Sequence, residues 1–134
     1  MASIKGLSTA FPKHKVFQEE VKELGRKIFA SKTNFKKMEK VYDNSGVKVR
    51  YLTKDLKWYL NEHNWSERNS LFKKNAILLL KKSISQTFEK SNTRPEDIGG
   101  IVLINSTGIS TPTLDAEIFN LFNFNNQVLR LPFF

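Results

Sequence analysis

The chain has 134 residues and a mass of 15.5 kDa, and with 40% apolar and 26% charged residues it can bury the core of one domain, which excludes a disordered tail. It has no cysteine, which excludes disulfides, thiolate metal sites and a cysteine nucleophile. It also has no apolar run of the roughly 20 residues that a membrane span needs. Its 22 basic and 13 acidic residues give a net charge of +9, which attracts polyanions but also arises when lysines simply cover solvated helix faces. The N-terminus lacks the apolar region of a signal peptide, so we expect a soluble protein of the cytoplasm.

The first half of the chain predicts a strand, two helices and a second short strand. Residues 3–11 form a mixed run closed by Pro12, which is typical of a strand that ends in a turn. Apolar residues at helical spacing then indicate two helices. Their apolar faces consist of Phe17, Val21, Leu24 and Ile28 in the first helix and of Phe35, Met38, Val41 and Tyr42 in the second. The second helix should stop near Ser45 and Gly46, before a weakly alternating strand within 47–53.

The second half predicts a long helix, a buried strand and a shorter helix. Ser66 is a good N-cap for a helix that runs to about Lys90. Its buried stripe should be Ile77, Leu80, Ile84 and Phe88, while Lys73, Lys74, Lys81 and Lys82 should largely face water. Residues 101–104 form a continuous apolar run rich in β-branched residues, the pattern of a strand covered on both faces. Thr111 and Pro112 should then begin a helix whose apolar face is Leu114, Ile118, Leu121 and Phe122.

The order of these elements predicts the fold class. Residues 128–134 indicate a last strand, so the chain alternates strand, helices, strand, helix and strand. This alternation predicts an α/β fold with a parallel sheet and crossover helices. The apolar end of the chain should lie inside a domain, because a small parallel sheet would otherwise expose edges and apolar faces. We therefore expect the sequence to be part of a longer protein.

Two places favour binding chemistry. Lys37 and Lys40 lie three residues apart on one helical face, so their ammonium groups could grip a phosphate, although a solvated helix face is the simpler interpretation. Residues 105–113 form a small, hydroxyl-rich loop at the carboxyl end of a buried strand, where open α/β sheets bind ligands. No histidine lies near this loop in the sequence, and neither His14 nor His63 has metal-ligand spacing around it, so we expect no metal site.

The loop also carries a family resemblance. The stretch INSTGISTPTLDA at 104–116 closely resembles the strand, loop and helix of type III polyketide synthases, the chalcone and stilbene synthase family. Further similar stretches are KGLSTAFP at 5–12, YDNSGVKVRY at 42–51, WSERN at 65–69, PEDI at 95–98 and VLRLPFF at 128–134. The resemblance covers essentially the whole chain. It implies that 1–134 is the N-terminal part of a thiolase-like domain, an incomplete α-β-α-β-α sandwich.

The resemblance implies an acyltransferase activity for the intact family. Its members join acyl units from a CoA-linked starter and malonyl-CoA by decarboxylative condensation, with CoA thioesters as substrates and no further cofactor. Their catalytic cysteine would follow directly after Phe134, and their catalytic histidine and asparagine much later. No residue of this chain therefore has a catalytic role by resemblance, and we expect the chain alone to be inactive. The intact protein is expected to be a homodimer that does not bind a membrane.

The resemblance also assigns binding roles to single residues. Lys37 and Lys40 correspond to residues that bind the CoA phosphates, with Asn44 in the place of a third basic residue. The remaining assignments are Ser106, Thr107 and Gly108 at the substrate cavity, and Thr111 and Pro112 in the loop at the dimer interface.

Two alternatives remain open from the sequence. A small basic module could use its charge to hold nucleic acid, although no recognised nucleic-acid motif is present and the lysines are spread over several helices. The chain could also act as a non-catalytic partner of a full-length relative through the loop around Thr111.

Overall fold

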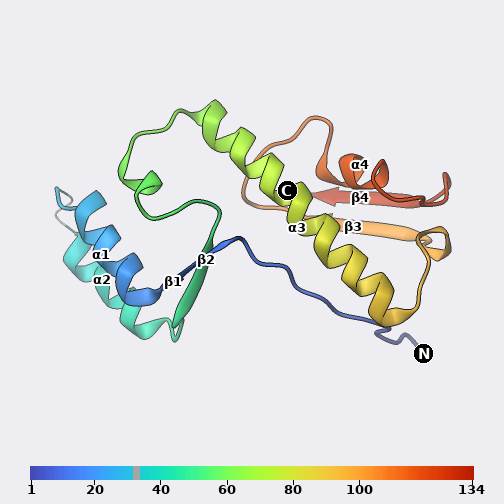
Figure 1. Ribbon diagram of the computed structural model, residues 1–134, viewed down its shortest axis with the longest axis horizontal. Coiled ribbons are helices and arrows are strands. Elements are labelled where there is room, and N and C mark those ends of the chain that lie inside the picture. The colour runs from blue at the N-terminus through green and yellow to red at the C-terminus, as the bar shows by residue number, and fades with distance from the viewer. Residues whose placement is uncertain (32–33) are drawn as a thin grey trace. The chain divides into compact units, whose positions relative to one another are not determined.

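The computed structural model describes residues 1–31 and 34–134 (Figure 1), and these form two compact units. One unit consists of Met1–Ala10 together with Asn64–Phe134, and is called the sheet unit below. The other consists of Phe11–His63 and is called the hairpin unit. Within the described residues, no helix is both long and apolar enough to cross a lipid bilayer.

The hairpin unit contains two helices and a small antiparallel sheet. Its elements are β1 (His14–Phe17), α1 (Gln18–Ile28), α2 (Phe35–Asn44), β2 (Val49–Leu52) and the short 3-10 helix η1 (Trp58–Leu60). β1 pairs with β2, with Val16 opposite Arg50. α1 begins directly after Phe17, whose backbone N–H donates to the Glu20 carboxylate at 2.7 Å. Both predicted helices and the strand within 47–53 are confirmed, and α2 ends just before Gly46, whose φ of +68° suits glycine.

The strand predicted at residues 3–11 is wrong. These residues have no regular structure, and the first strand begins at His14. In the sheet unit the segment runs beside the C-terminal half of α3 (Trp65–Ser91), where the Lys90 ammonium donates to the Leu7 carbonyl at 3.4 Å (Figure 1). A segment becomes a strand only when a neighbouring strand pairs with its backbone. No such neighbour exists among the described residues.

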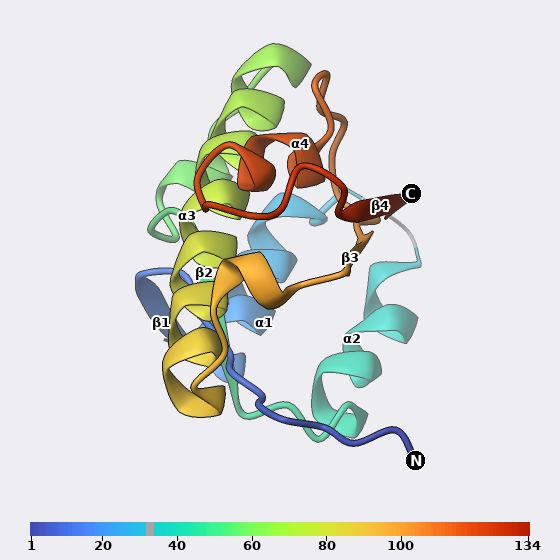
Figure 2. The same ribbon diagram turned by 90° about the vertical axis from the view of Figure 1, so that its right-hand side faces the viewer.

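The sheet unit has the predicted α/β crossover. After α3 come the 3-10 helix η2 (Pro95–Asp97), β3 (Gly100–Ile104), α4 (Leu114–Phe119) and β4 (Leu129–Phe133). β3 and β4 pair in parallel, as a crossover through a helix requires. α4 lies alongside α3, as both views show (Figure 2). The α/β class with a parallel sheet is therefore confirmed for this unit, whereas the hairpin unit carries a separate antiparallel pair.

Three details of α3 and α4 differ from prediction. α3 is capped by Asn64 rather than Ser66, because the Asn64 side chain accepts the Glu67 N–H at 2.8 Å. Lys73 does not simply face water, since its ammonium pairs with Glu117 of α4 at 2.7 Å. The third concerns α4, which begins after Thr113 without a side-chain cap and ends at Phe119. It therefore starts later than predicted and does not reach the expected positions Leu121 and Phe122.

Only one face of the parallel sheet is covered by the described residues, so the strand at 101–104 is not buried on both sides as predicted. Ile101 and Leu103 are partly buried, but Val102 is 63% and Ile104 is 79% exposed. The register places Leu131 beside Val102. On β4, three apolar side chains are also exposed: Leu129, Leu131 and Phe133. The apolar run indicates two covered faces, but α3 and α4 cover one.

The core of the sheet unit lies around α4. Leu114, Ile118 and Phe124 are its buried apolar side chains, and in the hairpin unit Val16 has this role. Four aromatic rings form one cluster here, with centroid distances between 5.6 and 6.2 Å for the pairs in contact: Phe88, Phe119, Phe122 and Phe124. These rings pack α4 and the turn after it against the C-terminal half of α3.

Candidate functional site

The loop between β3 and α4, residues 105–113, is held against α3 by one asparagine. The Asn69 amide donates to the Ile109 carbonyl at 2.8 Å and accepts the Ile109 N–H at 3.1 Å. Asn69 lies on the second turn of α3, 40 residues away in the chain. Its amide therefore replaces a backbone partner for this position and fixes the middle of the loop.

A second asparagine shapes the start of the loop. The Asn105 amide donates to the Gly108 carbonyl at 2.6 Å, and its oxygen accepts the Thr107 N–H at 3.1 Å. The Asn105 backbone N–H donates to the Phe133 carbonyl at 2.9 Å, which continues the β3–β4 pairing by one residue. The turn at 105–108 is thus closed by side-chain bonds and attached to the end of the sheet.

Gly108 is required at its place by contact with α3. A Cβ atom built there would lie 2.3 Å from Cδ1 of Phe72 and within 2.7 Å of two further ring atoms. No side chain fits without a shift of the ring or of the loop. The residue is held between Phe72 on one side and the Asn105 side chain on the other.

The structure brings the predicted loop residues together in one loop of the sheet unit. Ser106, Thr107, Thr111 and Pro112 are exposed and Gly108 is partly buried. The Ser110 hydroxyl donates to the Pro112 carbonyl at 2.5 Å, so it is committed to the backbone of the loop. The exposed hydroxyls of Ser106 and Thr107 form no hydrogen bond to a side chain among the described residues, and neither histidine belongs to this loop. The loop therefore exposes hydroxyl groups to solvent but holds no activated nucleophile among the described residues.

Behind the loop, a buried carboxylate holds α4 to β4. Asp115 is only 1% exposed, and its Oδ2 accepts a hydrogen bond from the Arg130 guanidinium at 3.3 Å. The same guanidinium lies over the Phe119 ring, 5.5 Å from its centroid. Asp115 Oδ1 has no hydrogen-bond partner among the described residues. The pair fixes the helix that follows the loop.

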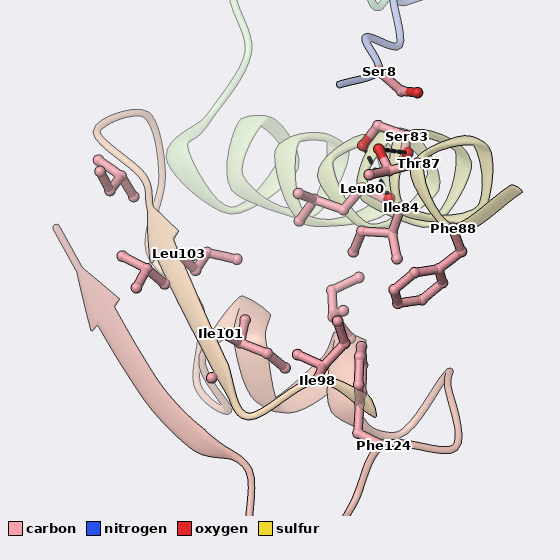
Figure 3. Close-up of a pocket in the computed structure, with 14 residues that line it drawn as sticks. Ser8, Leu80, Ser83, Ile84, Thr87, Phe88, Ile98, Ile101, Leu103 and Phe124 are labelled. Atoms are coloured by element: carbon pink, nitrogen blue, oxygen red, sulfur yellow. Dashed lines mark hydrogen bonds between the residues drawn. The ribbon is translucent and has the colours of Figure 1, made fainter. Parts of the chain in front are cut away.

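A cavity of about 390 Å³ lies between α3 and β3 in the sheet unit, shown in Figure 3. Its walls are mainly the predicted stripe of α3 and the covered face of β3, with Leu80, Ile84 and Phe88 on the helix side. The hydroxyls of Ser83 and Thr87 bond to backbone carbonyls of α3. The cavity has no ionisable group in its described lining, so it can hold apolar groups but supplies no acid or base.

Lys37 and Lys40 belong to the hairpin unit, where both are exposed on α2. Neither forms an ion pair among the described residues. The neighbouring cations are engaged: Lys22 pairs with Asp43 at 2.8 Å, and Arg26 pairs with Glu39. Lys37 and Lys40 thus remain available to an anion, while Asn44, the last residue of the helix, carries no charge.

His63 is held by a neighbouring aromatic ring and by the backbone. His63 stacks on Trp58 at a centroid distance of 3.7 Å, and its Nε2 lies 2.9 Å from the Trp58 carbonyl. In the part of the chain that the structure describes, no group of three or more His, Cys, Asp or Glu side chains could hold a metal ion.

The sequence analysis did not single out the residues that position the loop. Asn69 and Asp115 both lie inside stretches that resemble the family, but neither pattern indicates a partner. Their contacts, with Ile109 and Arg130, join segments far apart in the chain. Only the apolar spacing of α3 and α4 gave a signal, since it showed which face of each helix is turned inward.

Comparison with known proteins gives one family. No family model matches the chain. It is 24% identical over 140 residues to a putative chalcone synthase of Bacillus subtilis, covering 98% of this chain and 38% of that protein. The fold matches 1,3,6,8-tetrahydroxynaphthalene synthase, a bacterial type III polyketide synthase from Streptomyces coelicolor, with a TM-score of 0.82, 22% identity and coverage of 93% of this chain and 36% of that one. It also matches CsyB complexed with CoA-SH, with a TM-score of 0.79, 21% identity and coverage of 95% and 35%.

The chain thus spans somewhat over a third of the length of the relatives it matches. The nucleic-acid alternative finds no support among them. The relatives agree with the resemblance carried by the motifs at 104–116 and elsewhere. The chain is similar to type III polyketide synthases, and its fold is an incomplete part of their thiolase-like α/β fold.

Proposed function

We propose that the chain supplies the CoA-phosphate contacts and the dimer-contacting loop of a type III polyketide synthase-like acyltransferase. The observation that carries this proposal is the match of almost the whole chain to such enzymes, one of them, CsyB, complexed with CoA-SH. Cysteine is absent from the 134 residues, so the thiolate nucleophile of the family is not part of this chain. It contributes to substrate binding and not to bond formation.

Lys37 and Lys40 hold the phosphates of CoA in this proposal. Their ammonium groups lie one helical turn apart on an exposed face and have no carboxylate partner among the described residues. Two such point charges suit a phosphate and require no rearrangement of existing ion pairs. An exposed ion pair contributes only about 0.2–1 kcal/mol, so binding by this chain alone is weak and sensitive to salt.

The loop around Thr111 and Pro112 is the proposed contact with a second subunit. Both residues are exposed, whereas the loop behind them is fixed to α3 by Asn69. A rigid loop with an exposed tip can be presented to a partner without a large loss of conformational entropy.

Calorimetric titration with CoA tests the phosphate contacts. CoA should bind more tightly than pantetheine, which has the same thiol arm but lacks the nucleotide phosphates. The double variant Lys37→Gln/Lys40→Gln should lose about twofold to tenfold in affinity for CoA and nothing for pantetheine. Lys81→Gln/Lys82→Gln, which removes the same charge from an exposed part of α3, is the matched control. Equal losses in both double variants would refute a specific phosphate site.

A turnover assay tests the absence of chemistry. The purified chain should not consume malonyl-CoA, with or without an acyl-CoA starter, because it has no thiolate to form an acyl-enzyme. Sustained release of CoA above the buffer rate, proportional to the concentration of the chain, would contradict the proposal.

A further inference from the structure

A large groove crosses the hairpin unit between α1, α2 and β2. Its volume is about 840 Å³, and most of its wall is apolar. Six apolar side chains line it: Val21, Phe29, Phe35, Met38, Val41 and Leu52. Met38 is 62% and Val41 is 65% exposed, so these two side chains form an open apolar rim on α2. Exposed apolar surface of this kind favours an apolar occupant.

Among the described lining residues of this groove, Arg50 is the charged one, and a hydrogen-bond network around Gln18 holds its side chain. Gln18, which is 5% exposed, accepts a hydrogen bond from Arg50 Nε at 2.7 Å. The Gln18 amide in turn donates to the Tyr42 carbonyl at 3.0 Å and to the Ser45 hydroxyl at 3.2 Å. The guanidinium of Arg50 is thus held at the wall of the groove by Gln18, and the Gln18 side chain is itself fixed by two further hydrogen bonds.

The terminal N–H groups of Arg50 have no carboxylate among the described residues. This distinguishes Arg50 from Lys22 and Arg26, which are neutralised by Asp43 and Glu39. A partly buried guanidinium next to apolar surface binds a carboxylate well, since its planar fork matches the two carboxylate oxygens.

We propose that this groove binds an amphipathic carboxylate, a medium-chain fatty acid whose alkyl chain lies along Phe35, Met38 and Val41 and whose carboxylate pairs with Arg50. The groove volume lies within the range of about 300–1,000 Å³ that is usual for small-molecule sites. A single fixed cation matches a single carboxylate. The proposal goes beyond the CoA contacts, because it uses a different set of groups and holds whether or not Lys37 and Lys40 bind phosphate.

Displacement of a fluorescent fatty acid, cis-parinaric acid, from the whole chain tests the proposal. Dodecanoate and dodecanol have the same alkyl chain and differ in the charge of the head group. Dodecanoate should displace the probe at a concentration about tenfold lower than dodecanol, because a hydrogen-bonded charge contributes roughly that factor. Equal potency of the two compounds would overturn the proposal, since apolar surface alone would then explain binding.

Two variants locate the site, with a matched control. Arg50→Gln should weaken dodecanoate binding about tenfold and leave dodecanol unchanged, whereas Lys48→Gln, an equal loss of charge two residues away, should change neither. Met38→Asp should weaken both compounds, because Met38 lines the groove and is exposed enough to be replaced without unfolding the unit. If Met38→Asp leaves both affinities unchanged, the probe binds elsewhere, for example on the exposed face of β3 and β4, and the proposal is refuted. If circular dichroism shows that Arg50→Gln is unfolded, the comparison of dodecanoate with dodecanol on the unmodified chain decides whether the proposal holds.

Discussion

Replacing Gly108 with alanine tests how closely the loop after β3 packs against α3. The added Cβ would lie 2.3, 2.6 and 2.7 Å from three atoms of the Phe72 ring, all far below van der Waals contact. Phe72 is partly buried in the long helix, so its ring cannot swing freely into solvent. Either the ring leaves its rotamer or the loop moves away from α3.

The expected cost follows from these two responses. Overpacking of this kind costs about 1–3 kcal/mol. If the loop moves instead, the two hydrogen bonds between Asn69 and Ile109 are lost, which costs about 1 kcal/mol each. We therefore expect Gly108→Ala to destabilise the sheet unit by about 2–3 kcal/mol, which lowers the midpoint of urea unfolding by roughly 1–2 M.

Urea unfolding followed by circular dichroism measures this loss. Gly99→Ala is the control, because a Cβ at Gly99 meets nothing within 4 Å and this variant should change the midpoint little. A second substitution, Phe72→Leu, should recover part of the loss in the Gly108→Ala background and so give a positive coupling in a double-mutant cycle. If Gly108→Ala unfolds at the same urea concentration as the unmodified chain, the packing argument is refuted. If the substitutions at Gly99 and Gly108 lower the midpoint equally, the loss is not specific to the contact with Phe72.

Three further predictions concern other parts of the structure. Asn69→Ala should cost about 1–3 kcal/mol and speed hydrogen exchange of the Ile109 amide, because its N–H donates to no other acceptor among the described residues. Unchanged exchange by NMR would contradict the role of Asn69. Val102→Lys should reduce self-association in analytical ultracentrifugation, because Val102 lies on the uncovered apolar face of the sheet. Ile101→Lys, on the partly buried face, should instead unfold the unit. Equal behaviour of the two variants would contradict this assignment of the two sheet faces. The hydrogen bond from the Arg94 guanidinium holds the pKa of Asp97 below its ordinary value. The stability that this bond contributes is therefore present above about pH 4 and is lost as the pH falls through the lowered pKa. Asp97→Asn should flatten the acid limb of a plot of stability against pH, and an unchanged acid limb would contradict a stabilising role of the pair.

Local patterns predicted most of the elements because they depend on neighbours in the chain. Apolar spacing gave α1, α2 and α3 to within a few residues, and a turn residue at Gly46 marked the end of α2. The strand expected at residues 3–11 failed because pairing depends on a partner strand, which no local pattern reveals. The same holds for 101–104, whose apolar run indicates a covered strand but not which segments cover it.

The sequence predicted the position of the candidate loop and its resemblance to a family, but not the contacts that hold the loop in place. A hydroxyl-rich loop after an apolar strand marked residues 105–113 as a binding surface. The clamp by Asn69 and the contact between Gly108 and Phe72 join the loop to a helix that precedes it by about 40 residues. Helical periodicity shows that one side of α3 faces inward, but it does not show what that side meets.

Titration of the isotope-labelled chain with CoA, followed by backbone NMR, tests the central claim most directly. The account predicts that the largest shift changes occur at Lys37, Lys40 and their neighbours on α2, that they diminish as salt is added, and that pantetheine does not cause them. Shift changes of equal size with pantetheine, or changes spread over the lysines of α3 instead of α2, would contradict it.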